Sequence, residues 1–382
     1  MKILLYDMGA FTQNDLIFFL KKQGVTCRNI YYNFADIYKD DFFVKRFEKY
    51  LQADTYDFVM SINFYPLVAE ICYKNNMRYL SWSYDSPLSY KKYDYFHYET
   101  NYIFLFDRME YEGLVNLGFQ TVYHLPLGVN IDRLKAIRTT EADALEFGCD
   151  VSMVGQIYQS QLPEIMAPLS AYDRGFIDSI VQSQLLLYGY YFVDNLITDE
   201  MIRRIVEAHE QNGQEIEIGL RELSLAIATQ ITGMERKKLM EMMGSRFKTL
   251  LFSRHVAQVP EGVSYRGTAR YFDLMPKIFK LSKMNLNPTL KSICSGIPLR
   301  ALDILGSGGL LLSNYQHELV DYFTPGEDVV IYESLEDAVE KVEYYVNHET
   351  ERKRIAENGY RKVCEGFSFE RQVGKIFKVV GI

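Results

Sequence analysis

The sequence predicts an α/β protein of two domains, each built on a parallel sheet. Short apolar runs alternate with segments of helical periodicity along most of the 382 residues, which is typical of βα units whose strands are buried on both faces. A chain of this length is too long to fold around one hydrophobic core of ordinary size, and it fits two domains of roughly 150 to 200 residues each. Two such lobes are expected to face a central cleft.

The first domain is predicted over residues 1–147. It begins with an apolar run, then a loop, then a segment of helical spacing that ends in a glycine, and this order recurs along the domain. The repeated order predicts a Rossmann-like sheet. Its strands are expected in KILLY (2–6), YDFVMSINF (56–64), RYLSWSYDSP (78–87), NYIFLFD (101–107) and TVYHLPLGV (121–129).

The second domain is predicted over residues 148–365 and is Rossmann-like as well. Residues from about 160 to 250 show long helical periods without a convincing strand, so a helical insertion is expected there. Residues 366–382 are expected to form a last helix that packs back on the first domain. The strands of the second domain are expected within CDVSMVGQIYQ (149–159), GVSYRG (262–267), MNLNPT (284–289), GLLLSN (309–314) and DVVIYES (328–334).

The composition excludes some classes of protein. Lys plus Arg is 42 and Asp plus Glu is 50, a net charge of −8, which argues against a protein that mainly binds a nucleic-acid backbone. The five cysteines are scattered without metal-ligand or redox spacing and are expected to be reduced thiols. No apolar stretch approaches the roughly 18 residues of a membrane-spanning helix. We expect a cytoplasmic protein that can still work at the inner face of the membrane.

One segment of the second domain, NLNPTLKSICSGIPLRALDILGSGG (285–309), has the features of an anion-binding helix start. A helix is expected to begin near Pro298, because proline is favoured as the first helical residue, and its first-turn N–H groups and dipole favour a diphosphate. Gly296 lies in the loop before it. Arg300 in the first turn opposes the dipole unless an anion lies between, and Asp303 on the same face is placed to accept ribose hydroxyls.

A structural alternative exists for this segment. Its glycines would only end the helix, and Arg300 and Asp303 would form a solvated ion pair. Beyond the next strand, Asn314 and His317 are further candidates for contact with a ligand. Neither the six histidines nor the cysteines form a zinc pattern, and no Asp-x-Asp pair occurs in a suitable loop, so neither a metal nor another cofactor is expected.

In the first domain, Trp82 and Asp85 stand at the carboxyl end of a predicted strand, where ligands of parallel sheets bind. Both are candidates for contact with a second substrate, and Asp85 is a candidate general base. The structural alternative for Asp85 is a cap of the turn before Pro87. Gly9, after the first strand, would allow a ligand to approach the backbone closely, although a single glycine is also an ordinary loop residue.

Three stretches, IPLRALDILGSGGLLLSN (297–314), HELVDYFTPGEDVVIY (317–332) and ETERKRIAENGYRKV (349–363), resemble the C-terminal half of the GT-B glycosyltransferases. The resemblance is greatest to the branch related to the spore maturation protein CgeB. The stretches YLSWSYDSP, IFLFDRMEYEGLVNLGFQTVYHLPLGVN and DVSMVGQIY match the rest of that branch in order and spacing.

The resemblance implies that a nucleotide-diphosphate sugar binds mainly to the second domain. Asp303 stands where that branch has its ribose-binding glutamate, and Arg300 where it has its arginine. Many retaining relatives carry a sugar-contacting acid at the position of Ser295. Many also place an Arg and a Lys after the first strand of this domain, and since both are missing here, Lys291 or Arg266 is the candidate counter-charge for the diphosphate.

We therefore expect a metal-independent, retaining glycosyltransferase of hexosyl type. It would take a sugar from a donor such as a UDP-sugar and pass it to a glycan, glycolipid or protein acceptor in bacterial cell-surface polysaccharide synthesis. Two alternatives stay open, a nucleotide-sugar epimerase of the same fold and a catalytically degenerate binding or scaffold protein. The sugar, the base, the acceptor and the oligomeric state do not follow from the sequence.

Overall fold

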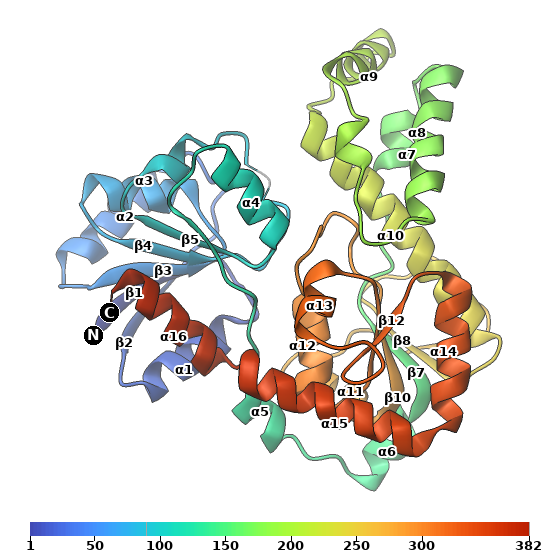
Figure 1. Ribbon diagram of the computed structural model, residues 1–382. Coiled ribbons are helices and arrows are strands. Elements are labelled where there is room, and N and C mark those ends of the chain that lie inside the picture. The colour runs from blue at the N-terminus through green and yellow to red at the C-terminus, as the bar shows by residue number, and fades with distance from the viewer. Residues whose placement is uncertain (89, 382) are drawn as a thin grey trace. The chain divides into compact units, whose positions relative to one another are not determined.

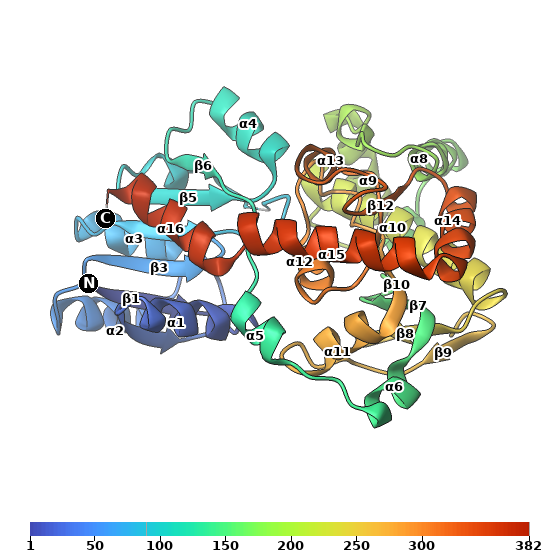
Figure 2. The same ribbon diagram turned by 60° about the horizontal axis from the view of Figure 1, so that its bottom comes forward.

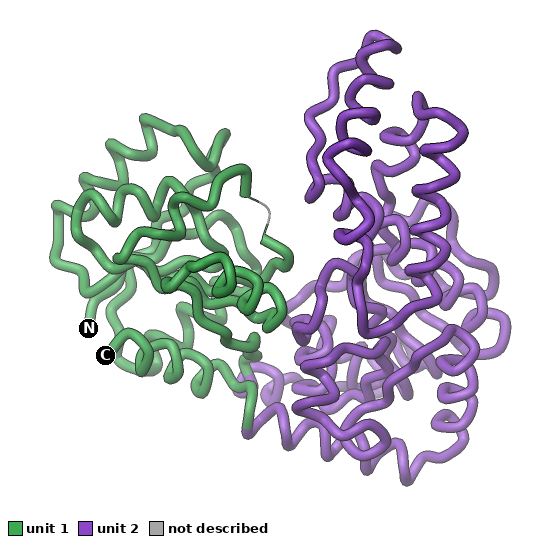
Figure 3. Tube along the Cα trace, turned by 45° about the horizontal axis from the view of Figure 1, so that its top comes forward, with its two compact units in different colours: residues 1–130, 366–382 green, residues 131–365 purple. Residues whose placement is uncertain are grey.

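The computed structural model describes residues 1–88 and 90–381, which form two compact units (Figure 3). Unit 1 comprises Met1–Asn130 with Gly366–Ile382, and unit 2 comprises Ile131–Glu365. The chain therefore leaves unit 1 after Asn130 and returns to it for its last helix. Residues 131–147, which are predicted to belong to the first domain, lie in unit 2.

Unit 1 contains a six-stranded sheet in the order β2-β1-β3-β4-β5-β6 (Figure 1). All its strand pairs are parallel, as predicted. The edge strand β2 was not predicted, because most of its side chains face solvent and form no apolar run. The strands are β1 (Lys2–Asp7), β2 (Thr26–Tyr31), β3 (Phe58–Ile62), β4 (Tyr79–Trp82), β5 (Asn101–Leu105) and β6 (Val122–His124).

Helices cover both faces of this sheet. Val59 of β3 packs into the core that includes residues of α2 and α3, whereas the ring of the preceding Phe58 lies 6.1 Å from that of Phe377 in α16. Neighbouring residues of a strand point to opposite faces, so the last helix of the chain covers the second face beside α1. The helices are α1 (Gln13–Lys22), α2 (Asp41–Gln52), α3 (Pro66–Lys74), η1 (Asp94–His97), α4 (Arg108–Asn116) and α16 (Phe369–Val380).

Unit 2 contains a second six-stranded sheet in the order β12-β11-β10-β7-β8-β9. Its strand pairs are also parallel. The sequence predicts five of these strands and misses β8, which has four residues and closely follows a long helix. The strands are β7 (Cys149–Val154), β8 (Thr249–Phe252), β9 (Val263–Tyr265), β10 (Ser282–Asn287), β11 (Leu311–Asn314) and β12 (Val330–Tyr332).

Figure 2 labels most helices of unit 2. These helices include the expected insertion between β7 and β8. They are α5 (Ile131–Ala136), α6 (Glu141–Phe147), α7 (Leu162–Met166), α8 (Ala171–Leu185), η2 (Val193–Asn195), α9 (Asp199–Gln211), α10 (Leu220–Gly244), α11 (Leu274–Leu281), α12 (Leu299–Gly306), α13 (His317–Tyr322), α14 (Leu335–Asn347) and α15 (Glu349–Gly366).

The insertion, α7 to α10, stands beyond the second sheet in Figure 1. It buries an apolar cluster of its own, which includes Leu162, Ile177, Ile205 and Ile227. The insertion is therefore stabilised by its own core and not only by contact with the sheet. Among the described residues, no helix combines the length and the apolar content that are needed to cross a membrane.

Helix α12 is the helix expected near Pro298, with one correction. Pro298 is the N-cap with an extended backbone (φ −67°, ψ 147°) and not the first helical residue, and no side chain caps the first turn. At the other end Gly308 has φ +80°, and a Cβ on Gly309 would lie 2.7 Å from the carbonyl oxygen of Phe279. These glycines therefore end the helix, as the structural alternative holds, and allow β11 to start close to neighbouring backbone.

Candidate functional site

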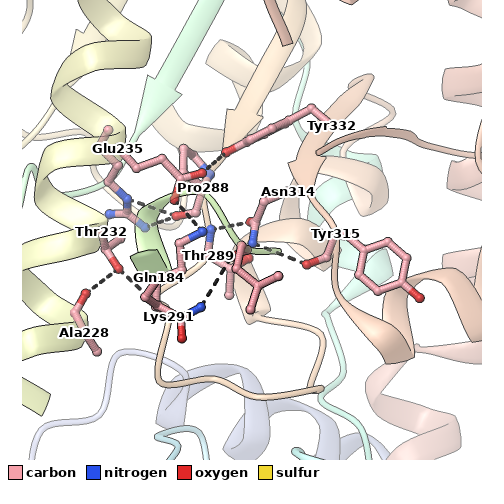
Figure 4. Close-up of polar contacts among 12 residues, drawn as sticks. Gln184, Ala228, Thr232, Glu235, Pro288, Thr289, Lys291, Asn314, Tyr315 and Tyr332 are labelled. Atoms are coloured by element: carbon pink, nitrogen blue, oxygen red, sulfur yellow. Dashed lines mark hydrogen bonds and ion pairs between the residues drawn. The ribbon is translucent and has the colours of Figure 1, made fainter. Parts of the chain in front are cut away.

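The carboxyl ends of β10 and β11 carry a hydrogen-bonded polar cluster, and Figure 4 shows its contact between Thr289 and Asn314. The Asn287 Nδ2 donates to the hydroxyl oxygens of Ser313 and Thr289, both at 3.1 Å. The Asn314 Oδ1 accepts a 2.7 Å hydrogen bond from the Thr289 backbone N–H. Ligands of parallel α/β sheets bind outside this edge. The cluster fixes the loop after β10, residues 288–298, against the end of β11.

A buried ion pair lies beneath that loop. The Lys291 Nζ is 3.0 Å from the Glu235 Oε2, and the two side chains are 5% and 0% exposed. The ammonium also lies 3.9 Å from the centre of the Tyr188 ring, and the Tyr332 hydroxyl donates to the Glu235 Oε1 at 2.8 Å. Burial and then the charge of Glu235 raise the pKa of Tyr188 far above its usual range, so this phenol stays neutral.

Helix α10 of the insertion holds two loops of the sheet edge. The Thr232 Oγ1 accepts from the Lys291 backbone N–H at 3.0 Å. The Arg236 Nε donates to the Pro288 carbonyl at 3.0 Å, and its Nη1 donates to the Gln156 carbonyl at 2.6 Å. Because Gln156 follows β7 and Pro288 follows β10, one guanidinium ties the two central loops of the edge to the insertion.

Glu235, Arg236 and Tyr188 were not found by sequence reasoning, although one signal was available. Glu235 lies on the apolar stripe of α10, four residues after Ile231 and four before Leu239, both of which are buried. A charge on such a stripe must be paired or hydrogen-bonded. The stripe therefore points to a buried partner, but it does not identify Lys291.

Arg300 and Asp303 lie together in the first turns of α12, as their spacing predicts. The Arg300 Nη1 is 3.3 Å from the Asp303 Oδ2, and the Tyr271 hydroxyl donates to the Asp303 Oδ1 at 3.1 Å. The same guanidinium nitrogen lies 2.8 Å from the Met275 sulfur. Asp303 is 4% exposed, so the pair is not a solvated surface ion pair.

Ser295 and Glu318 form a second buried contact next to α12. The Ser295 Oγ donates to the Glu318 Oε1 at 3.0 Å, and the Glu318 N–H donates to the Ser295 carbonyl at 3.0 Å. Both residues are buried, as is Gly296 beside them. The position where many relatives carry an acid thus holds a serine that hydrogen-bonds to a carboxylate from α13.

His317 and Arg266 lie farther out on the surface of unit 2. The His317 Nε2 is 2.5 Å from the Gly189 carbonyl oxygen, and its ring meets that of Tyr315 edge-on at 5.3 Å. Arg266 directly follows β9 and is exposed. Of the predicted residues in this unit, the structure brings Lys291 and Asn314 to one small cavity of about 20 Å³, which has room for about one water molecule.

In unit 1, Asp85 is exposed after β4, and its Oδ2 accepts a 2.6 Å hydrogen bond from the Asn63 Nδ2. Gly9 has φ +93°, and its N–H donates to the Asp7 Oδ1 at 2.7 Å. Burial, then the charges of Asp85 and Asp7, raise the pKa of Tyr65 to about 12. These residues follow β1, β3 and β4, so they gather at one carboxyl edge of the first sheet.

Trp82 has a different environment from the one expected. Its side chain is fully buried, and its ring meets those of Tyr84 and Phe369 edge-on at 5.2 and 5.7 Å. Phe369 belongs to α16, so the indole packs in the core between β4 and the last helix. Trp82 therefore supports the sheet edge from below rather than lining its surface.

Comparison with known proteins supports an assignment for part of the chain. Residues 234–378 match the family model described as "Glycosyl transferase-like". The match begins in α10 and includes β8 to β12, so it contains α12 and the loop after β10. No curated protein matches the sequence significantly.

Solved structures resemble the whole chain. A glycosyltransferase from Rickettsia africae is 9% identical, with a TM-score of 0.60 over 99% of this chain and 97% of that one. Sucrose-phosphate synthase from Thermosynechococcus elongatus is 10% identical, with a TM-score of 0.59 over 100% and 99%. Anabaena Alr3699/HepE, in complex with UDP and glucose, is 9% identical, with a TM-score of 0.54 over 99% and 100%. These similarities confirm the predicted fold class, GT-B.

Proposed function

We propose that this protein is a glycosyltransferase that binds a nucleotide-diphosphate sugar at the carboxyl edge of the unit 2 sheet. The fold and the family match over residues 234–378 support the class of enzyme. The single observation that carries the site is the pair formed by Arg300 and Asp303, 3.3 Å apart in the first turns of α12. This pair places a cation and a buried acceptor beside a helix start that no side chain caps.

The chemistry of transfer suits this arrangement. As the bond between the sugar's anomeric carbon and the diphosphate breaks, its electron pair passes to a phosphate oxygen. First-turn N–H groups of α12 and the Arg300 guanidinium would stabilise that charge, which is the task a metal performs in other transferases. The Asp303 carboxylate would exchange its bond from Tyr271 for one from a ribose hydroxyl. The acceptor hydroxyl oxygen then bonds to the anomeric carbon, and its proton passes to the oxygen of the departing phosphate.

The finer features of the proposal rest on the sequence resemblance. They are membership of the CgeB-like branch, hexosyl transfer with retention, independence from metal, and action on a bacterial surface glycan at the inner face of the membrane. Gly296, Lys291, Arg266, Asn314 and His317 stay candidates for donor contact. On the acceptor side Asp85 stays the candidate base for the case of inversion, because its carboxylate is exposed. UDP is the first nucleotide to test, since Anabaena Alr3699/HepE binds it.

The test is thermal-shift binding of UDP, GDP, TDP and CDP in the presence of a chelator. A nucleotide at 100 times its Kd should stabilise the wild type by about 2.7 kcal/mol. The Asp303→Ala and the isosteric Asp303→Asn variants should lose this shift. Asp273→Ala is the matched control, because Asp273 is an exposed carboxylate paired with Arg270 near the start of α11. If no nucleotide raises the unfolding temperature of the wild type, the proposed donor site is wrong.

A second measurement separates an enzyme from a scaffold. With UDP-glucose and other UDP-sugars, a transferase should release UDP, slowly to water and faster once an acceptor is found. Arg300→Ala should lower kcat more than it raises KM, since the charge that Arg300 stabilises develops as the bond breaks. Nucleotide binding without any UDP release would favour the degenerate protein, and interconversion of two UDP-sugars would favour the epimerase.

A further inference from the structure

The insertion contains two adjoining cavities that no step of the proposed chemistry uses. One has a volume of about 370 Å³ and lies among α7, α8 and α10. The other, of about 470 Å³, lies between α10 and the loop after β7. They share Pro163, Gln230 and Met234 as wall residues. We call the two together the insertion groove, and its size is that of a ligand-binding site.

Polar side chains line the insertion groove in two rows. On α8, Arg174, Asp178 and Gln182 follow at intervals of four and share one face. On α10, Gln230 lines both cavities and Lys237 lines the second. Among the residues that the structure describes, the side chains of Asp178, Gln182 and Gln230 have no hydrogen-bond or ion-pair partner. Their hydrogen-bonding groups are available to a ligand.

The first cavity also has apolar lining residues with flexible or small side chains. Met166, Val181 and Met234 are among them. Amide and carboxylate side chains present neighbouring donor and acceptor atoms, which suit the vicinal hydroxyls of a sugar, and an aliphatic lining suits the C–H face of a sugar ring. With one acid and two bases among its named polar residues, the groove fits a neutral polyhydroxyl chain better than a strongly charged ligand or a hydrocarbon chain alone.

The insertion groove leads to the sheet edge described above. Its second cavity is lined by Tyr158 and Gln159, which follow β7. The Arg236 guanidinium lies 4.7 Å from the Tyr158 ring centre and donates to the carbonyls of Gln156 and Pro288. The wall of the groove and the loop after β10 are therefore held by one side chain. A chain lying in the groove would end beside the loops of the proposed donor site.

We propose that the insertion groove binds the acceptor and that this acceptor is a neutral oligosaccharide. The proposal rests on the proposed glycosyltransferase function and assigns its acceptor to unit 2. The groove spans both cavities, so the acceptor contributes several sugar units and not a single one. The insertion then has a stated role, because it holds the growing glycan next to the donor.

The test measures binding to immobilised neutral oligosaccharides without nucleotide. The wild type should bind at least one of them, and binding should weaken at least tenfold in the Gln182→Ala/Gln230→Ala double variant and in Met234→Glu. Leu225→Glu is the matched control, because Leu225 is 41% exposed on the same helix outside the groove, and this variant should bind like the wild type. Absence of glycan binding by the wild type, or equal loss in Leu225→Glu, would overturn the proposal.

Two further arms separate this proposal from its rivals. Dodecyl maltoside is compared with maltotriose, and a groove that binds only the detergent is a lipid site, which contradicts an oligosaccharide acceptor. UDP thermal shifts are measured on the same variants and should be unchanged, since these residues belong to α8 and α10 and not to α12 or the loop after β10. A shift with UDP but no glycan binding would reject the groove and leave the proposed function standing. Glycan binding without a nucleotide shift would reject the proposed donor site and leave the groove standing as a glycan-binding site.

Discussion

The Lys291 ammonium lies 3.0 Å from the Glu235 carboxylate, and both side chains are buried. The pair joins the loop after β10 to the insertion helix α10, which precedes it by more than fifty residues in the chain. Removing two charges from water is costly, so a buried pair is stable only with good geometry and further hydrogen bonds. Tyr332 and Tyr188 complete those contacts here. The pair thus holds a site loop in one position on the helical insertion.

Substitution of one partner should destabilise the protein strongly. Lys291→Met leaves a buried carboxylate unpaired, which typically costs about 3–5 kcal/mol, and unit 2 should unfold at a lower temperature. The double variant Lys291→Met/Glu235→Leu should recover much of the loss, because it removes both charges. Calorimetry measures both effects. Lys353→Met at the exposed pair with Glu349 is the control and should change little. Equal losses in the single and the double variant would show that packing, not charge, matters.

The contact between Ser295 and Glu318 gives a second prediction. Ser295→Ala removes a hydrogen bond to a buried carboxylate, so it should lower the free energy of unfolding by about 1–3 kcal/mol. Ser295→Glu should be worse, because it places two carboxylates in contact and adds volume to a packed site. Urea denaturation provides the measurement.

Ser292→Ala provides the control for this pair. Ser292 is buried in the same loop, and among the described residues its hydroxyl has no hydrogen-bond partner. Its removal should therefore be neutral or slightly stabilising. A Ser295→Glu variant as stable as the wild type would show that Glu318 does not occupy the place that the extra carboxylate needs.

The third prediction concerns pH and the edge of unit 1. Burial, then Asp85 and Asp7, raise the pKa of Tyr65 from 10 to about 12. Between these values the unfolded chain has lost the proton and the folded one keeps it, so stability falls as pH rises from about 10 to 12. Asp85→Asn should lower the pKa of Tyr65, because it removes a neighbouring negative charge.

NMR of ¹³Cζ-labelled tyrosine measures this pKa, with Tyr65→Phe to assign the signal. Asp94→Asn is the control, because Asp94 acts on Tyr95 and Tyr98 and does not perturb Tyr65. An unchanged pKa of Tyr65 in Asp85→Asn would contradict the placement of Asp85 close to Tyr65 at one edge of the first sheet.

Local sequence signals predict most of the fold and only part of the site. Apolar runs identify strands that are buried on both faces, which is why β2, with an exposed face, escapes them. Helical spacing places Arg300 and Asp303 together because their contact lies within one turn. The partner of Lys291 cannot be found this way, since Glu235 reaches it only through long-range packing of α10.

Trp82 shows the same limit in unit 1. Its position at the end of β4 correctly predicts that Trp82 lies at the carboxyl edge of the sheet. It does not predict whether the side chain lines the surface of that edge or is buried in the core beneath it. Phe369, from the other end of the chain, covers the indole, and no pattern within residues 78–87 contains that information. Tertiary contact between distant segments therefore decides whether a residue at a strand end lines a site or supports it.

The fourth prediction uses a glycine in the wall of the insertion groove. A Cβ on Gly233 of α10 would lie 2.5 Å from the Tyr158 carbonyl oxygen, which is too close for any ordered structure. Alanine at a helix position favours the helix by about 1 kcal/mol over glycine. The steric cost of overpacking, about 1–3 kcal/mol, should exceed that gain, because backbone and not a flexible side chain must move.

Gly233→Ala should therefore destabilise the protein and push the loop after β7 away from α10. The shift would strain the hydrogen bonds of Arg236 and widen the groove, so oligosaccharide binding should weaken while the first turns of α12 stay intact. Gly175→Ala in α8 is the control, because a Cβ there meets nothing within 4 Å, and it should stabilise the protein by about 1 kcal/mol. Thermal unfolding and glycan binding of both variants decide the point. If Gly233→Ala matched Gly175→Ala in both measurements, the close packing of α10 on the loop would be absent, and with it the wall that shapes the groove.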